Sequence, residues 1–213
     1  MLVWKEEPIL CIDTETTGPD PDTARVVEIA LALMLKGAVQ WACTWRVNPG
    51  VAIPKAASEV HGIYNEDVVE APPFEAILDL VGLVMYYRVC AAYNAPFDRL
   101  ILAREFALCG AEVPPEWWID PLVLARQFIR IRGSGIFRLD NICSRLRIDL
   151  GELAHTATAD AVASGKIISH YASQLPDDLQ EFAELQAFWA EEQWSEWVAY
   201  CNRVGRDPGK KRV

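Results

Sequence analysis

An aspartate and a glutamate stand two positions apart near the start of the chain, in the segment ILCIDTETTG of residues 9–18. The apolar run 9–12 is typical of a short buried strand. Because successive side chains of a strand point to opposite faces, Asp13 and Glu15 should project from the same side at its end. Two carboxylates about 5 Å apart repel each other by ~3 kcal/mol at an effective dielectric of about 20, so a bound divalent cation would explain their proximity.

Two further acids and a histidine have comparable settings. Asp98 follows an apolar strand expected at 89–93 and precedes a helix expected at 99–109, where interaction with the helix dipole is its ordinary explanation. Asp160 belongs to a mostly apolar helix that ends near Tyr171, and His155 lies on the loop before it. Four carboxylates without other ligand types suit Mg²⁺ or Mn²⁺ rather than zinc. This donor set predicts phosphoryl transfer at a site for hard cations.

The elements that must position these residues indicate an α/β fold. Three strands are expected in succession, at 9–12, 25–35 and 39–47, with Gly37 in a hairpin turn between the last two. Glu28 interrupts the second strand, and we interpret it as a polar residue on an exposed or hydrogen-bonded face. Strand and helix units then alternate at 89–93, 99–109, 118–120 and 121–131. This order predicts a mixed central sheet flanked by helices.

Further helices are expected after Pro54, at 74–87 and at 138–147, before a long final helix. The length of 213 residues fits one domain with an appended segment. We divide the chain into a main domain at 1–175, an acidic helix with several tryptophans at 176–204, and a basic flexible tail at 205–213. The acidic helix could bind a polymerase, cover the core of its own domain, or join two copies of the chain.

The formal net charge of −10 does not exclude a nucleic-acid substrate. Seven acids and no basic residue lie between 177 and 200, whereas residues 126–147 hold six arginines against Asp140 alone. Arginine recognises phosphate through paired hydrogen bonds, so the stretch 126–147 is a candidate contact for a phosphate backbone. It is equally consistent with the sequence that these arginines lie on solvated helix faces and bind no phosphate.

No apolar run is long enough to cross a membrane, and the first residues lack the pattern of a secretory signal. We therefore expect a cytoplasmic protein without a membrane partner. Its six cysteines are scattered among apolar neighbours and form no closely spaced pair of the zinc-binding kind. We interpret them as reduced core residues.

Three motifs occur in series: Asp-x-Glu-Thr-Thr-Gly, then Asn-Ala-x-Phe-Asp, then His-x-Ala-x-x-Asp-Ala. Together they resemble the exonuclease motifs of the DEDD superfamily, histidine branch (DEDDh), which includes the proofreading subunit of bacterial replicative polymerase. The resemblance covers about residues 8–171. It implies a ribonuclease H-like fold and a 3′–5′ exonuclease that releases nucleoside 5′-monophosphates from the 3′ end of single-stranded nucleic acid.

Position by position, the resemblance also implies roles for individual residues. Asp13, Glu15 and Asp160 would hold two divalent ions, Mg²⁺ or Mn²⁺, and Asp98 would complete the site directly or through water. His155 would be the general base, for which a pKa near ~6.5 is suitable at neutral pH.

The same resemblance assigns the substrate side of the site. The segment formed by Thr16, Thr17 and Gly18 would seat the terminal nucleotide. His61, Asn94 and Phe97 match positions near the substrate, although a lone histidine such as His61 is more often structural on its residue type alone. Tyr93 departs from the pattern, because many relatives have histidine there, but no catalytic role depends on it.

Two other classes of protein compete with this interpretation. A non-catalytic nucleic-acid-binding or scaffold domain could keep the fold, but all five expected catalytic positions are filled here. A phosphatase of the haloacid dehalogenase kind would want a second aspartate in place of Glu15 and would leave the other two motifs unexplained. The sequence leaves the choice between DNA and RNA open.

Overall fold

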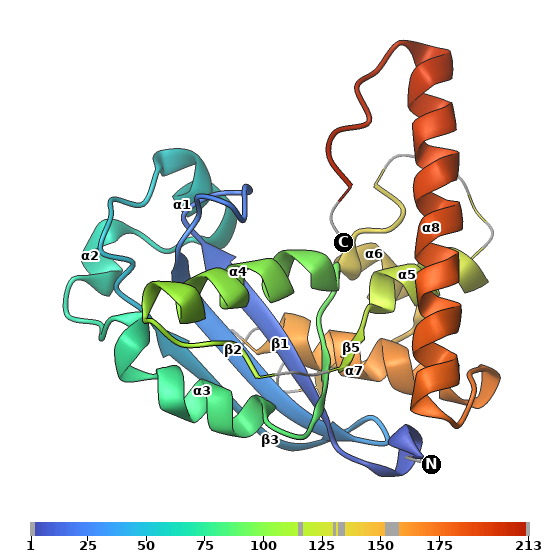
Figure 1. Cartoon of the computed structure of the whole chain (residues 1–213), viewed down its shortest axis with the longest axis horizontal. Coiled ribbons are helices and arrows are strands. Elements are labelled where there is room, and N and C mark those ends of the chain that lie inside the picture. The colour runs from blue at the N-terminus through green and yellow to red at the C-terminus, as the bar shows by residue number, and fades with distance from the viewer. Residues whose placement is uncertain (1–2, 115–116, 130, 132–134, 152–157, 212–213) are drawn as a thin grey trace.

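The computed structural model describes residues 3–114, 117–129, 131, 135–151 and 158–211 (Figure 1). At its centre is a five-stranded sheet in the order β3-β2-β1-β4-β5. The strands are β1 (Ile9–Thr16), β2 (Val26–Leu35), β3 (Ala38–Arg46), β4 (Val89–Ala91) and β5 (Trp117–Ile119). β1, β2 and β3 are antiparallel neighbours, whereas β4 runs parallel to β1 and β5 parallel to β4. The predicted mixed α/β sheet is confirmed.

The first strand is longer than expected. It continues through the two acids to Thr16, so Asp13 pairs with Ala30 and Glu15 pairs with Glu28. The long apolar strand β2 supplies backbone partners beyond residue 12, and these ladder hydrogen bonds keep the chain extended despite its polar side chains. The predicted hairpin turn is present, with Lys36 and Gly37 at positive φ values of 49° and 79°.

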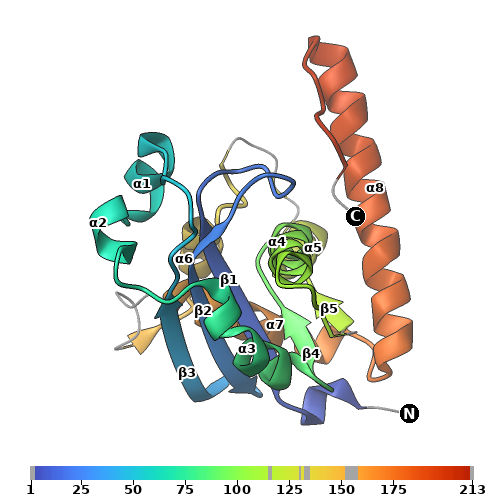
Figure 2. The same ribbon diagram turned by 60° about the vertical axis from the view of Figure 1, so that its left-hand side comes forward.

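Helices cover both faces of the sheet (Figure 2). α3 (Leu78–Met85) and α4 (Ala95–Leu108) pack on one face, where they share a core with Leu10 and Ile12 of β1. α5 (Pro121–Phe128), α6 (Leu139–Leu146) and α7 (Ala159–Tyr171) pack on the other, together with Cys11. Since side chains alternate along β1, Asp13 and Glu15 continue the row of Cys11 and face the α7 side.

A glycine allows α7 to lie close to the sheet. A Cβ atom on Gly165 would stand 2.7 Å from Cγ of Met34 and 2.9 Å from Sγ of Cys11. Both distances are shorter than packed carbon and sulfur atoms tolerate, so a larger residue here would push the helix away. Gly165 therefore fixes the distance between α7 and β1.

The smaller helices differ in part from the expectation. α1 (Lys55–His61) follows Pro54 as predicted, whereas α2 (Asn65–Val68) was not foreseen. The predicted helix at 74–87 is divided into the 3₁₀ turn η2 (Phe74–Ala76) and α3. α4 begins at Ala95, earlier than predicted, because Pro96 fits the first turn of a helix. Two further 3₁₀ turns are η1 (Trp4–Glu6) and η4 (Ala172–Gln174).

The last helix, α8 (Leu179–Val204), lies beside α5 and β5 and extends beyond them (Figures 1 and 2). Its first half is part of the domain core. Phe182 is buried and stacks on Trp4 with 5.0 Å between ring centroids, and Trp189 is buried as well. Gln186 Nε2 donates to the carbonyl of Trp118 at 3.0 Å. In this half the helix covers the core of its own domain.

The second half of α8 carries exposed apolar side chains, among them Tyr200 and Val204. The basic segment after it runs back along the helix, as Figure 1 shows, and Trp197 Nε1 donates to the carbonyl of Pro208 at 3.0 Å. The guanidinium of Arg206 lies over the Trp197 ring. Flexibility of the tail stays a prediction.

Two further properties follow from the described part of the chain. Among the described residues no cysteine forms a disulfide bond, and Cys11, Cys90 and Cys201 are buried. Among the described residues no helix combines the length and the apolar character that crossing a membrane requires.

The packing of α8 predicts the effect of two matched substitutions. Phe182→Ala should lower the free energy of unfolding by about 3–5 kcal/mol, because it leaves a cavity under Trp4. Phe188→Ala in the same helix should change it by less than about 0.5 kcal/mol, since that side chain is 57% exposed. Urea unfolding measures both values. Similarly small decreases in the free energy of unfolding of the two variants would contradict the assignment of α8 to the core.

Candidate active site

Asp13 lies in β1 among the other predicted acids. Burial raises the pKa of its carboxyl group well above the ordinary value, and the negative charges of Asp98, Asp160 and Glu15 raise it further. The structure thus brings these three acids within electrostatic range of Asp13. A group surrounded in this way favours protonation or a cation.

Glu15 is the second acid of β1. Its pKa is raised to about 7 by burial and then by the charges of Asp160 and Glu28, while Arg46 opposes the shift. Glu28 stands directly opposite Glu15 in β2 and is buried. Arg46 Nε lies 2.6 Å from Glu28 Oε2. Glu28 is therefore buried rather than exposed, and it forms an ion pair with an arginine.

Asp98 occupies the first turn of α4 and is 4% exposed. The hydroxyl of Thr14, next to Asp13 in β1, donates to Asp98 Oδ1 at 2.7 Å. Burial raises the pKa of Asp98 to about 7, and the hydrogen bond from Thr14 partly offsets the rise. This bond fastens the start of α4 to the end of β1.

Asp160 lies in the first turn of α7 and differs from the expectation of a charge within an apolar helix. The helix itself is buried at Ala161 and Val162, but the Asp160 side chain is exposed at the end of the sheet. Partial burial and the nearby charge of Asp140 in α6 raise its pKa. The apolar residues that follow it belong to the core, whereas Asp160 itself is exposed.

These four acids are near one another but do not form a ready coordination shell. Within the described residues no three His, Cys, Asp or Glu side chains are arranged so that they could hold a metal ion as they stand. Carboxylates that repel each other separate until a cation draws them together. The assignment of metal ligands to Asp13, Glu15, Asp98 and Asp160 stays a prediction.

The segment after β1 is held by several hydrogen bonds. Thr16 Oγ1 donates to the carbonyl of Gly18 at 2.7 Å, and Thr17 exchanges two bonds with the backbone of Arg25. The Arg25 guanidinium in turn forms a two-pronged ion pair with the buried Glu105 of α4. The loop that should seat a terminal nucleotide is therefore anchored to the same helix that carries Asp98.

The remaining substrate candidates lie at the end of α1 and at the start of α4. His61 ends α1, its Nδ1 accepts from the Ile63 amide at 3.0 Å, and its buried Nε2 has no partner among the described residues. Burial lowers the pKa of the His61 imidazole. Asn94 caps α4 in the left-handed conformation, with φ of 68°, and Phe97 follows in the first turn. His155 falls in residues 152–157, outside the described residues.

Asp120 is an important residue that we did not predict. It is buried, and its Oδ1 accepts from the amides of Asn94 at 3.0 Å and Leu122 at 2.9 Å, so it joins the starts of α4 and α5. Burial raises its pKa to about 6. The Asp-Pro sequence before an apolar helix is a typical N-cap signal and could have indicated this role.

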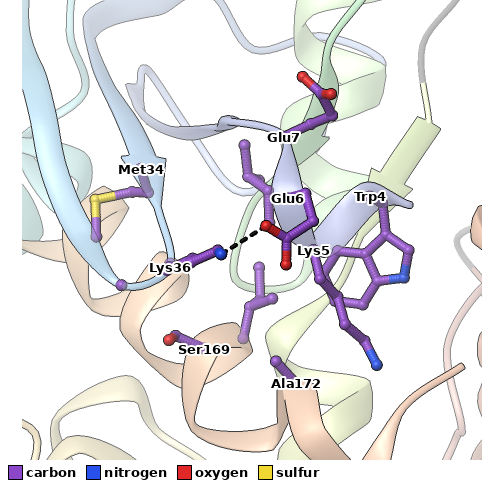
Figure 3. Close-up of a pocket in the computed structure, with 12 residues that line it drawn as sticks. Trp4, Lys5, Glu6, Glu7, Met34, Lys36, Ser169 and Ala172 are labelled. Atoms are coloured by element: carbon purple, nitrogen blue, oxygen red, sulfur yellow. Dashed lines mark ion pairs between the residues drawn. The ribbon is translucent and has the colours of Figure 1, made fainter. Parts of the chain in front are cut away.

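A cavity of about 280 Å³ lies at the other end of β1 (Figure 3). It is lined by Trp4, Ile9 and Met34 among others, and the ion pair of Lys36 with Glu6 crosses it. Of the predicted site residues that the structure describes, none lines this cavity. The acids and this hollow are thus separate features of the molecule.

The profile of the exonuclease family (RNase_T) matches residues 10–168. The chain belongs to this exonuclease family. It is 33% identical over 165 residues to the DNA polymerase III subunit epsilon of Rickettsia felis, an alignment that spans 74% of this chain and 71% of the relative. It is also 27% identical over 157 residues to the 3′-5′ exonuclease DinG of Bacillus subtilis, spanning 73% of this chain but only 16% of that protein.

Solved exonucleases share the fold. Exonuclease I superposes with a TM-score of 0.67 at 18% identity, over 78% of this chain and 41% of its own. Exonuclease X in complex with 5′ overhanging duplex DNA gives a TM-score of 0.63 at 22% identity, over 84% of this chain and 99% of its own. The predicted ribonuclease H-like fold of the DEDD superfamily is confirmed.

The raised pKa values predict how pH affects this exonuclease-family domain without metal. In EDTA, the unfolded chain ionises Glu15 near 4.5, whereas the folded chain keeps it protonated until about pH 7. Unfolding therefore releases a proton in this window, so the contribution of Glu15 to stability falls as pH rises from 4.5 to 7.

Glu15→Gln should remove this contribution. The melting temperature of Glu15→Gln minus that of the parent chain should increase from about pH 4.5 to about pH 7 and stay constant above that. Thermal unfolding in EDTA at several pH values measures it. A difference that stays constant with pH would show that Glu15 titrates normally in the folded chain.

Proposed function

We propose that this chain is a metal-dependent 3′–5′ exonuclease that releases nucleoside 5′-monophosphates from single-stranded nucleic acid. The observation that carries the proposal is the set of acids that raise the pKa of Asp13 at the end of β1. Such a cluster costs stability unless a cation compensates it. Membership in the exonuclease family supports phosphodiester hydrolysis as the reaction that uses the cation.

Two divalent ions, Mg²⁺ or Mn²⁺, fit the chemistry of these residues. Asp13, Glu15 and Asp160 would hold them, and Asp98 would complete the site directly or through water. Carboxylate oxygens are the donors that these ions prefer, and two divalent charges equal the four formal charges of the acids. When bound, the ions would stabilise the negative charge that develops on the phosphoryl group.

His155 is the proposed general base. It would accept the proton of a water molecule whose oxygen attacks the terminal phosphorus while the bond to the 3′-oxygen of the preceding nucleotide breaks. An imidazole with an ordinary pKa near ~6.5 is suited to this task at neutral pH. The support for His155 is its place in the third motif, five residues before Asp160.

The loop after β1 would position the substrate. Its anchoring to Arg25, and through Arg25 to Glu105, supports a fixed backbone against which a terminal 3′-hydroxyl can bind. Thr16 ends β1, and Thr17 and Gly18 follow it in this loop. His61 at the end of α1, and Asn94 and Phe97 at the start of α4, would contact the substrate as well. Rigid positioning of a reacting group contributes to catalysis by reducing the entropy lost in the transition state.

DNA is the first substrate to test, because the relatives include a subunit of a DNA polymerase and the fold is shared with exonuclease X, which was solved in complex with duplex DNA. The exposed second half of α8 is our candidate surface for a polymerase or for a second copy of the chain. Removal of residues 205–213 should leave the folded domain intact. A cytoplasmic location is part of the same proposal.

The activity can be tested with 5′-labelled single-stranded DNA and RNA oligonucleotides. With Mg²⁺ or Mn²⁺ the chain should shorten them stepwise from the 3′ end, and EDTA should stop the reaction. Asp13→Ala should abolish it. Asp79→Ala, which removes an exposed acid of α3, should retain it. Stable, folded protein that cleaves neither strand would favour a non-catalytic binding domain.

The role of His155 has its own test. His155→Ala should lower kcat by roughly 10²- to 10⁴-fold and remove the acidic limb of the pH profile, since that limb reports protonation of the base. His170→Ala, at the far end of α7, should stay within about twofold of the parent chain. An unchanged pH profile in His155→Ala would assign the base to another residue.

A further inference from the structure

Arg46 ends β3 beside the acids but has no place in the three motifs. The register aligns Glu15 of β1, Glu28 of β2 and Arg46 of β3 in one row across the sheet. Directly paired residues of neighbouring strands point to the same face. The Arg46 side chain therefore lies on the face that carries Asp13 and Glu15.

The electrostatic neighbourhood agrees with this placement. Burial raises the pKa of Glu15 and the charge of Arg46 opposes that rise, whereas burial lowers the pKa of His61 at the end of α1 and the charge of Arg46 adds to that lowering. The charge of its guanidinium thus affects the pKa of one predicted metal ligand and of one predicted substrate contact. Arg46 stands at the border between the two parts of the site.

The ion pair with Glu28 holds the Arg46 side chain in this position. The Glu28 side chain is 10% exposed and lies opposite Glu15, where a second negative charge is unfavourable. Arg46 compensates this charge through Nε, 2.6 Å from Glu28 Oε2. An apolar residue at position 28 would remove the repulsion without an arginine, so a stabilising role alone does not account for the pair.

The pairing leaves the outer part of the guanidinium available. The shortest contact of the ion pair runs from Nε to Glu28 Oε2, and within the described residues neither terminal nitrogen of Arg46 makes a side-chain hydrogen bond. The Arg46 side chain is 44% exposed. The planar fork of an exposed guanidinium matches the oxygens of a phosphate, and the ion pair with Glu28 reduces the entropy lost on binding.

We propose that Arg46, held by Glu28, binds a backbone phosphate of the substrate strand next to the scissile one. This inference rests on the proposed function. Strands are about 4.8 Å apart, so the Arg46 backbone lies about 10 Å from that of Glu15, with Glu28 between them. The scissile phosphate belongs to the acids, and Arg46 serves the neighbouring nucleotide.

A pair of substrates separates this role from a structural one. A single-stranded oligonucleotide has phosphates beyond the scissile bond, whereas the p-nitrophenyl ester of thymidine 5′-monophosphate has none. Arg46→Gln should raise KM for the oligonucleotide about tenfold with kcat within about twofold, and should leave turnover of the ester unchanged. Arg46→Lys, which keeps the charge but loses the fork, should restore KM in part.

Salt dependence gives a second readout. The plot of log(kcat/KM) for the oligonucleotide against log salt concentration should become shallower by about 0.7 in Arg46→Gln, the value for one phosphate contact on a single strand. Lys36→Gln removes an exposed, ion-paired cation at the other end of β2 and should change neither slope nor KM. Melting temperatures establish that each variant is folded.

The outcomes are distinct. Equal losses on oligonucleotide and ester would overturn the proposal in favour of a structural pair, and so would an unchanged KM. If the parent chain cleaves neither substrate, the proposed function fails, and fluorescence anisotropy with a labelled oligonucleotide in EDTA still decides the role of Arg46. Weaker binding by Arg46→Gln than by Lys36→Gln would support the contact, and equal binding would refute it.

Discussion

Electrostatic repulsion at one end of β1 is the constraint on which the arrangement of this domain depends. Asp13 is surrounded by acids from β1, α4 and α7. The repulsion between these acids would separate the three elements if no other interaction held them together. Apolar packing supplies the opposing force, because Leu10 and Ile12 bury one face of β1 and Cys11 the other. Gly165 keeps α7 against that second face, so Asp160 cannot move far from the strand.

Hydrogen bonds add to the apolar packing in fixing the positions of these elements. Thr14 fastens Asp98 to β1, and Asp120 fastens the start of α4 to the start of α5. Gln186 of α8 accepts from the Asp120 amide at 2.8 Å, which connects the C-terminal helix to the same corner. Buried polar groups thus fix the elements that carry the site residues, and their hydrogen-bond partners come from distant parts of the chain.

Much of this was predictable from the sequence. The hairpin at Gly37 and the order of strands and helices follow from turn residues and apolar periodicity, which are local signals. The extension of β1 through Glu15 was missed because its cause is the neighbouring strand β2. The same holds for Arg46, whose position beside Glu28 depends on a strand register that sequence spacing does not reveal.

The site residues illustrate the same limit. The motifs indicated which acids belong together, but not that Asp160 would be exposed or that Thr14 would bind Asp98. Asp120 carried a readable capping signal, yet its bond to Asn94 crosses 26 positions of the chain. Local patterns identify residues, and tertiary contacts determine how each is held.

The most direct test of the account is a crystal structure of the chain with Mn²⁺, measured at a wavelength where manganese scatters anomalously. We expect two anomalous peaks beside the carboxylates of Asp13, Glu15 and Asp160, with Asp98 bound directly or through water. Their absence in the parent protein at saturating Mn²⁺, or peaks only at other surface acids, would contradict the claim that these carboxylates are held together to bind cations.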